Sequence, residues 1–138
     1  MRSAVKLLAI SSIVLFSSMA FANDIYITQS GDNLDLDIVQ DGTNNVIGSS
    51  ITAVSLSGDD MSFDINQTGN NNTITAVIKG ATYTGDWDIT GDNNEIDLLC
   101  SSTTTGSCDT VTLNVTATGD DNDFTINIGE TSDSDSAT

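Results

Sequence analysis

The spacing of the glycines constrains the fold of this chain more than any other feature of its sequence. They stand eleven residues apart in two runs, which are Gly31 and Gly42, then Gly58, Gly69, Gly80 and Gly91. Between them apolar and polar residues alternate, a pattern typical of half-buried β-strands. Every acid inside these segments falls on the polar face, so a shift of one residue would bury all of these carboxylates. The sequence therefore predicts an all-β fold with a strongly specified register.

The alternating segments fall into two classes, so the true repeat contains two strands. One class begins at Leu34, Met61, Tyr83 and Val111, and the other begins at Asn45, Asn72, Asn94 and Asn122. Copies that share columns at a fixed period, here roughly 22 residues, are the signature of a solenoid. We expect a β-solenoid of about four and a half coils over residues 23–129. Two stretches lengthen the period, five residues between Gly42 and Gly58 and six between Cys100 and Cys108, and both are predicted to bulge from the stack as loops.

The turn motif G-x-x-N predicts a tight corner between two strands, because glycine adopts backbone angles that other residues resist. The predicted turn glycines are Gly31, Gly42, Gly58, Gly69, Gly80, Gly91 and Gly119. The Asn that closes the corner recurs once per coil and is expected to stack on its equivalents as an amide ladder. The predicted ladder residues are Asn45, Asn72, Asn94 and Asn122, together with Gln29, Gln40 and Gln67. The alternative is a set of ordinary hairpin turns in an antiparallel sheet.

The start of the chain, positions 1–22, reads as a secretory signal peptide, with basic residues, an apolar run and Ala20-Phe21-Ala22 before the cleavage site. The apolar run is too short to span a membrane. Removal of Arg2 and Lys6 leaves Lys79 alone against 20 acids, a formal charge of −19. Such a surface repels nucleic acid and anionic membranes, so neither a nucleic-acid partner nor membrane insertion is predicted. The acidic tail, residues 130–138, is predicted to be unstructured.

The remaining candidate sites are the cysteines and one column of carboxylates. Cys100 and Cys108 are expected to form a local disulfide in an exported chain, with a redox or metal pair as the rival interpretation. Asp37, Asp64 and Asp86 fall in one outward column, about 4.8 Å apart on successive coils. Their mutual repulsion predicts that assembly is favoured by salt, low pH or divalent cations. They are weak candidates for calcium ligands, the alternative is a solvated acidic face, and no cofactor is predicted.

On these residues the chain resembles curlin, the amyloid subunit of bacterial curli fibres. The curlin motif Q-x-G-x-x-N, with a second Gln eleven residues after the first, is similar to Gln29–Gly31 followed by Gln40–Asn45, and to Gln67–Asn72. The sequence departs from the motif at the Gln positions occupied by Ile78, Ile89 and Ala117. The resemblance implies a secreted β-solenoid that stacks end to end with itself and with related subunits. It also implies periplasmic chaperones, an outer-membrane secretion pore and a cell-surface fibre of a Gram-negative bacterium.

The pattern favours a fibre subunit for biofilm matrix and adhesion, and three other functions are alternatives. A monomeric, acidic, calcium-binding β-solenoid adhesin is the main alternative. A glycosidase-like enzyme would use paired carboxylates, but no His is present and so short a solenoid leaves no evident pocket, so we predict no enzymatic activity. An ice- or surface-binding solenoid would need a flat array of Thr. Thr73, Thr75, Thr112 and Thr116 contribute to one, but Asp interrupts the neighbouring columns.

Overall fold

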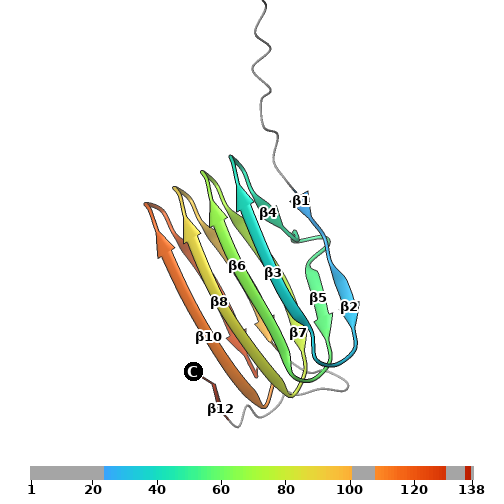
Figure 1. Ribbon diagram of the computed structural model, residues 1–138. Helices are drawn as coiled ribbons and strands as arrows, with labels where there is room; N and C mark the ends of the chain where they lie inside the picture. Colours follow the sequence, from blue (N-terminus) through green and yellow to red (C-terminus); the bar gives the residue numbers. More distant parts are fainter. Residues whose placement is uncertain (1–23, 101–107, 130–135, 138) are drawn as a thin grey trace, which may run out of the picture.

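The computed structural model describes residues 24–100 and 108–129 and the backbone of residues 136–137 (Figure 1). The predicted signal peptide, residues 1–22, lies outside the described residues. Over the described ranges no helix has the length and hydropathy needed to cross a membrane. One sheet, sheet A, contains β1 (Asp24–Ile25), β2 (Thr28–Ser30), β4 (Val46–Ile47), β5 (Val54–Ser57), β7 (Thr73–Lys79), β9 (Glu95–Cys100) and β11 (Asp123–Ile128). Sheet B contains β3 (Asp35–Asp41), β6 (Met61–Thr68), β8 (Thr82–Thr90), β10 (Thr110–Thr118) and β12 (Ser136–Ala137).

Both sheets are parallel, and the long strands alternate between them along the chain. The prediction of an all-β fold is confirmed, and the alternative of hairpins in an antiparallel sheet is wrong. Antiparallel hairpins would pair strands joined by a tight turn, whereas here β6, for example, turns directly into β7 in the opposite sheet. The arrangement is consistent with a β-solenoid. We call the strands at one level of the stack a rung: β1–β3, then β4–β6, then β7 with β8, then β9 with β10, and finally β11 with the short β12.

The strand registers show how the two interruptions of the period are accommodated. In the regular part, β6 pairs with β8 and β7 with β9, and partners such as Thr73 and Glu95 stand 22 positions apart in the sequence. The separation is 27 between β3 and β6, and 28 between β8 and β10. β4 and β5 both pair with β7, through Ile47↔Ile74 and Val54↔Ala76. Residues 48–53 therefore bulge out of one strand position, and the neighbouring rungs keep their register.

The core consists of the inward faces of the two sheets. Its buried members include Ile47, Leu56, Phe63, Ile74, Ile78, Tyr83, Trp87, Ile96 and Leu98. Phe63 and Trp87 pack edge to face, with ring centroids 5.7 Å apart. Gly85 leaves room for the Tyr83 hydroxyl, because a Cβ at Gly85 would overlap it. The aromatic layer is therefore close-packed around a glycine.

The corners explain why glycine recurs, and the reason differs in part from the sequence prediction. A Cβ on Gly91 would overlap the carbonyl oxygen of Gly69 in the preceding rung, and Gly119 is related to Gly91 in the same way. Glycine is therefore required at these corners for two reasons. The stacked backbones lie too close together for a Cβ, and the φ angles of Gly91 and Gly119 are positive. The left-handed conformation is adopted two residues later, by Asn or Asp, which tolerate it better than other side chains: Asn33, Asn44, Asp60, Asn71, Asn93 and Asp121.

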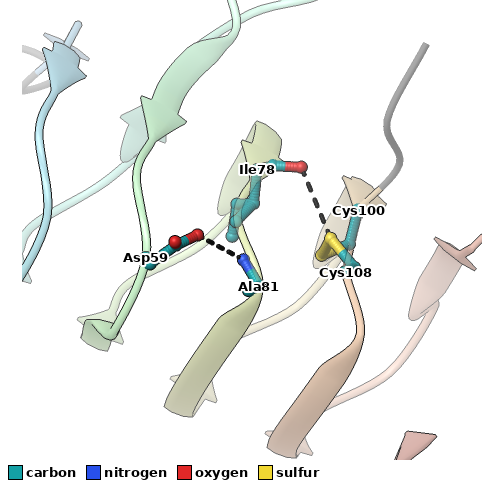
Figure 2. The surroundings of a disulfide bond; sticks show 5 residues. All are labelled: Asp59, Ile78, Ala81, Cys100 and Cys108. Carbon is teal, nitrogen blue, oxygen red and sulfur yellow. Dashed lines mark hydrogen bonds between the residues drawn. A yellow bond between two sulfur atoms is a disulfide. The ribbon is translucent and has the colours of Figure 1, made fainter. Parts of the chain in front are cut away.

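A disulfide joins Cys100 to Cys108, and both residues are fully buried. Figure 2 shows the bond at the corner between β9 and β10, where the Cys108 sulfur lies 3.7 Å from the carbonyl oxygen of Ile78. At the neighbouring corner the Asp59 carboxylate accepts a hydrogen bond from the Ala81 N–H at 2.8 Å (Figure 2). The disulfide thus joins the two ends of the inserted segment. After it, β10 pairs with β8 in the regular register.

The tail differs from its prediction at one place. Residues 130–138 were expected to lack structure, but Ser136–Ala137 forms β12, which pairs in parallel with Thr110 and Val111 at the start of β10 (Figure 1). An edge strand offers unpaired N–H and C=O groups, and β10 has such an edge on the side away from β8. The other residues of the tail lie outside the described part of the chain.

Candidate functional site

A ladder of buried amides runs along one corner of the stack. Asn45 Nδ2 donates to Asn72 Oδ1 at 3.2 Å, Asn72 Nδ2 to Asn94 Oδ1 at 2.9 Å, and Asn94 Nδ2 to Asn122 Oδ1 at 2.7 Å. Asn72, Asn94 and Asn122 each also donate to the carbonyl of the glycine three residues earlier. The first three members are almost fully buried. Each amide therefore fixes its own turn and the spacing to the next rung.

The asparagine ladder has a direction, and its two termini differ. Every side-chain donor points toward the C-terminal rungs. At the first member, Asn45 Oδ1 is buried and accepts no hydrogen bond from the described residues. At the last member, Asn122 is exposed, and the one bond described for its Nδ2 is to the Gly119 carbonyl at 2.9 Å. A primary amide has two N–H protons. Within the described part of the chain, the ladder therefore begins with an acceptor and ends with an N–H proton that have no partner.

The glutamines form a shorter ladder. Gln67 Nε2 donates to Gln40 Oε1 at 2.7 Å inside sheet B. Gln29 does not join them, because it lies in sheet A opposite Leu56, and its Nε2 donates to the Gly31 carbonyl. The predicted glutamine ladder therefore contains two of its three members.

A second asparagine ladder, which sequence reasoning missed, runs along the exposed side of the same corner. Asn71 Nδ2 donates to Asn44 Oδ1 at 2.9 Å, and Asn93 Nδ2 donates to Asn71 Oδ1 at 3.0 Å. Its members are the residues two positions after the turn glycines, so their recurrence in the sequence was the available signal. The next rung has Asp121 at this position, which carries no amide donor.

The candidate calcium column has other hydrogen-bond partners. Trp87 Nε1 donates to the Phe63 carbonyl at 2.9 Å, which takes the acceptor that a regular β-ladder would offer to the Asp86 N–H. The Asp86 N–H donates instead to Asp64 Oδ1 at 2.8 Å, and Asp86 Oδ1 accepts from Asn114 Nδ2 at 2.9 Å. Asp37 is the register partner of Asp64. Among the described residues no three acidic, Cys or His side chains form a group that could hold a metal ion.

The two ends of the stack expose what the middle buries. At the N-terminal end, formed by β1–β3, the inward residues Ile25, Ile27, Leu34 and Leu36 are only partly buried. At the C-terminal end, formed by β10 and β11, Phe124 is 42% and Ile126 38% exposed. Among the long strands of sheet B, β3 and β10 lie at opposite ends (Figure 1), and β12 covers only the start of β10. We take these two ends, with their open strand edges and ladder termini, as the candidate functional site.

No protein-family model, no curated protein and no solved structure matches this chain. The geometry defines a class of architecture, a parallel β-stack held by asparagine and glutamine ladders, as found in β-solenoid and amyloid-like folds. The resemblance to curlin remains a prediction from the sequence motif.

Proposed function

We propose that this protein is a structural subunit of an extracellular, curli-like fibre, a β-solenoid of four and a half coils that joins to its copies end to end. The carrying observation is the exposure of Phe124 and Ile126 at the C-terminal end. Their register partners in β9 are Ile96 and Leu98, whose side chains are at most 1% exposed. A further β-strand from another copy would remove this apolar surface from water, at about 25 cal/mol per Å².

Two further features support self-association over binding of an unrelated partner. The strand edges at both ends present backbone donors and acceptors at a spacing that matches another parallel strand. A Cβ on the first-rung glycine Gly42 would make an ordinary van der Waals contact, 3.5 Å from Asn45 Oδ1, whereas a Cβ on Gly69 in the next rung would overlap the carbonyl oxygen of Gly42. A copy stacked on the N-terminal end would give Gly42 the same close neighbour.

Assembly is opposed by charge, since the exported chain carries a formal charge of −19. Salt screens this repulsion, so fibres are expected to form faster in about 0.5 M NaCl than in dilute buffer. Matrix formation and adhesion would follow from the fibre itself. Export through an outer-membrane pore with periplasmic chaperones belongs to the same proposal and is supported by the sequence resemblance.

The test uses the exported chain and two charge substitutions on one strand. Ile126→Asp puts a carboxylate in the inward column, where a docked copy would bury it unpaired. Thr125→Asp puts the same group on the exposed face of β11. Wild type and Thr125→Asp should form thioflavin-positive fibres with cross-β diffraction, and Ile126→Asp should remain monomeric. A wild-type protein that stays monomeric at this higher salt concentration, or gains order only with calcium, would contradict the proposal and favour the adhesin.

A further inference from the structure

The strand count of the molecule limits how two copies can join. Sheet A has five levels, occupied by β1 with β2, β4 with β5, β7, β9 and β11, whereas sheet B has four long strands, β3, β6, β8 and β10. Strands within a sheet are about 4.8 Å apart. In a continuous stack both sheets must advance by the same length per copy. Placing β1 and β2 of one copy on β11 of another would advance sheet A by five strands, whereas the fifth level of sheet B holds only the two described residues of β12.

We propose, on the basis of the fibre function proposed above, that copies join by strand replacement: β11 of one molecule displaces β1 and β2 of the next. Both sheets then advance by four strands per copy. β10 pairs directly with β3 of the next copy, and β12 leaves the first two residues of β10. The surface that binds the second copy is therefore the edge of β4 and β5 together with the edge of β3.

The displaced strands and the replacing strand are equivalent in register. The column Asp24, Val46, Thr73, Glu95 and Asp123 runs through the whole of sheet A. Phe124 consequently occupies the column of Ile25. The sequences of residues 23–27 and 122–126 are also alike, NDIYI and NDFTI.

β1 and β2 together form the shortest ladder in sheet A. β1 pairs with β4 over two residues and β2 with β5 over three, whereas β11 is a continuous strand of six residues. β7 already pairs with both β4 and β5 on their other edge, so a continuous strand is compatible with the loop of residues 48–53. Through the columns of β7 and β9, β11 would meet five residues of β4 and β5. Replacement therefore keeps the number of paired positions and supplies them from one continuous strand.

Two buried polar atoms of the free molecule also gain from the replacement. Asn45 Oδ1, which accepts no hydrogen bond from the described residues, would face Asn122 Nδ2 of the neighbouring copy, the unused donor of the same ladder. Gln29 Oε1 is likewise buried without a described partner, in a column otherwise formed by Leu56, Ile78, Cys100 and Ile128. Ile128 would take the place of Gln29 there. Satisfying or removing a buried unpaired polar group is favourable.

A pair of engineered cross-links tests whether β1 must leave. Asp24→Cys with Val46→Cys joins partner residues of β1 and β4, and Asp37→Cys with Asp64→Cys joins partner residues of β3 and β6, which replacement leaves intact. Native folding of both oxidised monomers is checked by circular dichroism. Elongation is then measured from wild-type seeds. We expect the β1–β4 cross-link to slow elongation at least tenfold, mild reduction to restore it, and the β3–β6 cross-link to have little effect. Equal rates for the two oxidised chains would overturn strand replacement and leave the fibre function standing.

A second measurement reports the junction directly and does not depend on the engineered monomers elongating alone. Chains with Asp123→Cys are assembled with an equal amount of chains carrying either Val46→Cys or Asp24→Cys, and the fibres are oxidised. Strand replacement places Asp123 beside Val46 of the next copy, so disulfide-linked dimers are expected with Val46→Cys only. Dimers with Asp24→Cys only would show that copies stack without exchange, and fibres lacking both dimers would also overturn the proposal. Absence of fibres from wild type would instead overturn the fibre function.

Discussion

Leu98 in the middle of the stack and Ile126 at its C-terminal end have the same chemistry and the same place in the sheet, yet differ in burial. They are register partners in neighbouring strands, and Leu98 is fully buried while Ile126 is 38% exposed. The difference arises because Leu98 has a rung on both sides and Ile126 has one. In a stacked fold an inward side chain is therefore buried by the rungs on either side of it, and the next rung can come from the same chain or from another. Three comparisons between middle and end residues make this measurable.

The largest effect is expected at the turn glycines. Gly91→Ala would force a Cβ into the carbonyl oxygen of Gly69, in addition to placing Ala at φ 155°. Gly31→Ala, at φ 139°, meets no atom closer than 3.5 Å. We expect Gly31→Ala to cost about 1–2 kcal/mol from backbone strain, and Gly91→Ala to cost more than about 4 kcal/mol or to prevent folding. Urea unfolding of the monomer measures both, and equal losses would mean that backbone conformation alone selects glycine.

The second comparison uses the two aliphatic residues themselves. Leu98→Ala removes a fully buried side chain from between two rungs and should reduce the free energy of unfolding by about 2–5 kcal/mol. Ile126→Ala removes a side chain that is already partly in water, so we expect a loss below about 1.5 kcal/mol in the monomer. Denaturant unfolding at low protein concentration measures both. Equal losses for Ile126→Ala and Leu98→Ala would mean that Ile126 is as deeply buried in the free monomer as Leu98, contrary to this structure.

The smallest effect is expected at a buried hydroxyl. Tyr83 is fully buried and its hydroxyl has no hydrogen-bond partner among the described residues. Tyr83→Phe should therefore stabilise the protein by about 1 kcal/mol. The control Tyr26→Phe, at a side chain that is 52% exposed, should change stability by less than about 0.5 kcal/mol.

The same substitution predicts a pH dependence. Burial raises the pKa of Tyr83 far above its ordinary value of 10, so above pH 10 the unfolded chain releases a proton that the folded chain retains. Wild type should then lose up to about 1.4 kcal/mol of stability per pH unit relative to Tyr83→Phe. Unfolding curves at pH 9 and pH 11 measure the difference. An unchanged gap between the two proteins would contradict burial of this hydroxyl.

Part of the site was predictable from the sequence because it is periodic. Asn45, Asn72, Asn94 and Asn122 recur after each turn glycine, and their pairing as a ladder follows once the strands are stacked in register. Gln29 belongs to the same sequence motif but not to the glutamine ladder. It lies in β2 of sheet A, whereas Gln40 and Gln67 lie in sheet B. Membership of a column depends on which sheet a strand enters, and the local motif does not encode that.

The sequence by itself determined the inward face of every long strand, the positions of the corners and the segments that must bulge, since these depend on residue types at fixed local spacing. The tertiary structure alone decided what each residue meets one full coil further along the chain. The steric need for Gly91, the displacement of a backbone bond by the Trp87 indole, and the surplus strand in sheet A are all consequences of contacts between rungs. Those contacts depend on the distance and register of neighbouring backbones, which a repeat pattern specifies only after the chain has folded around itself.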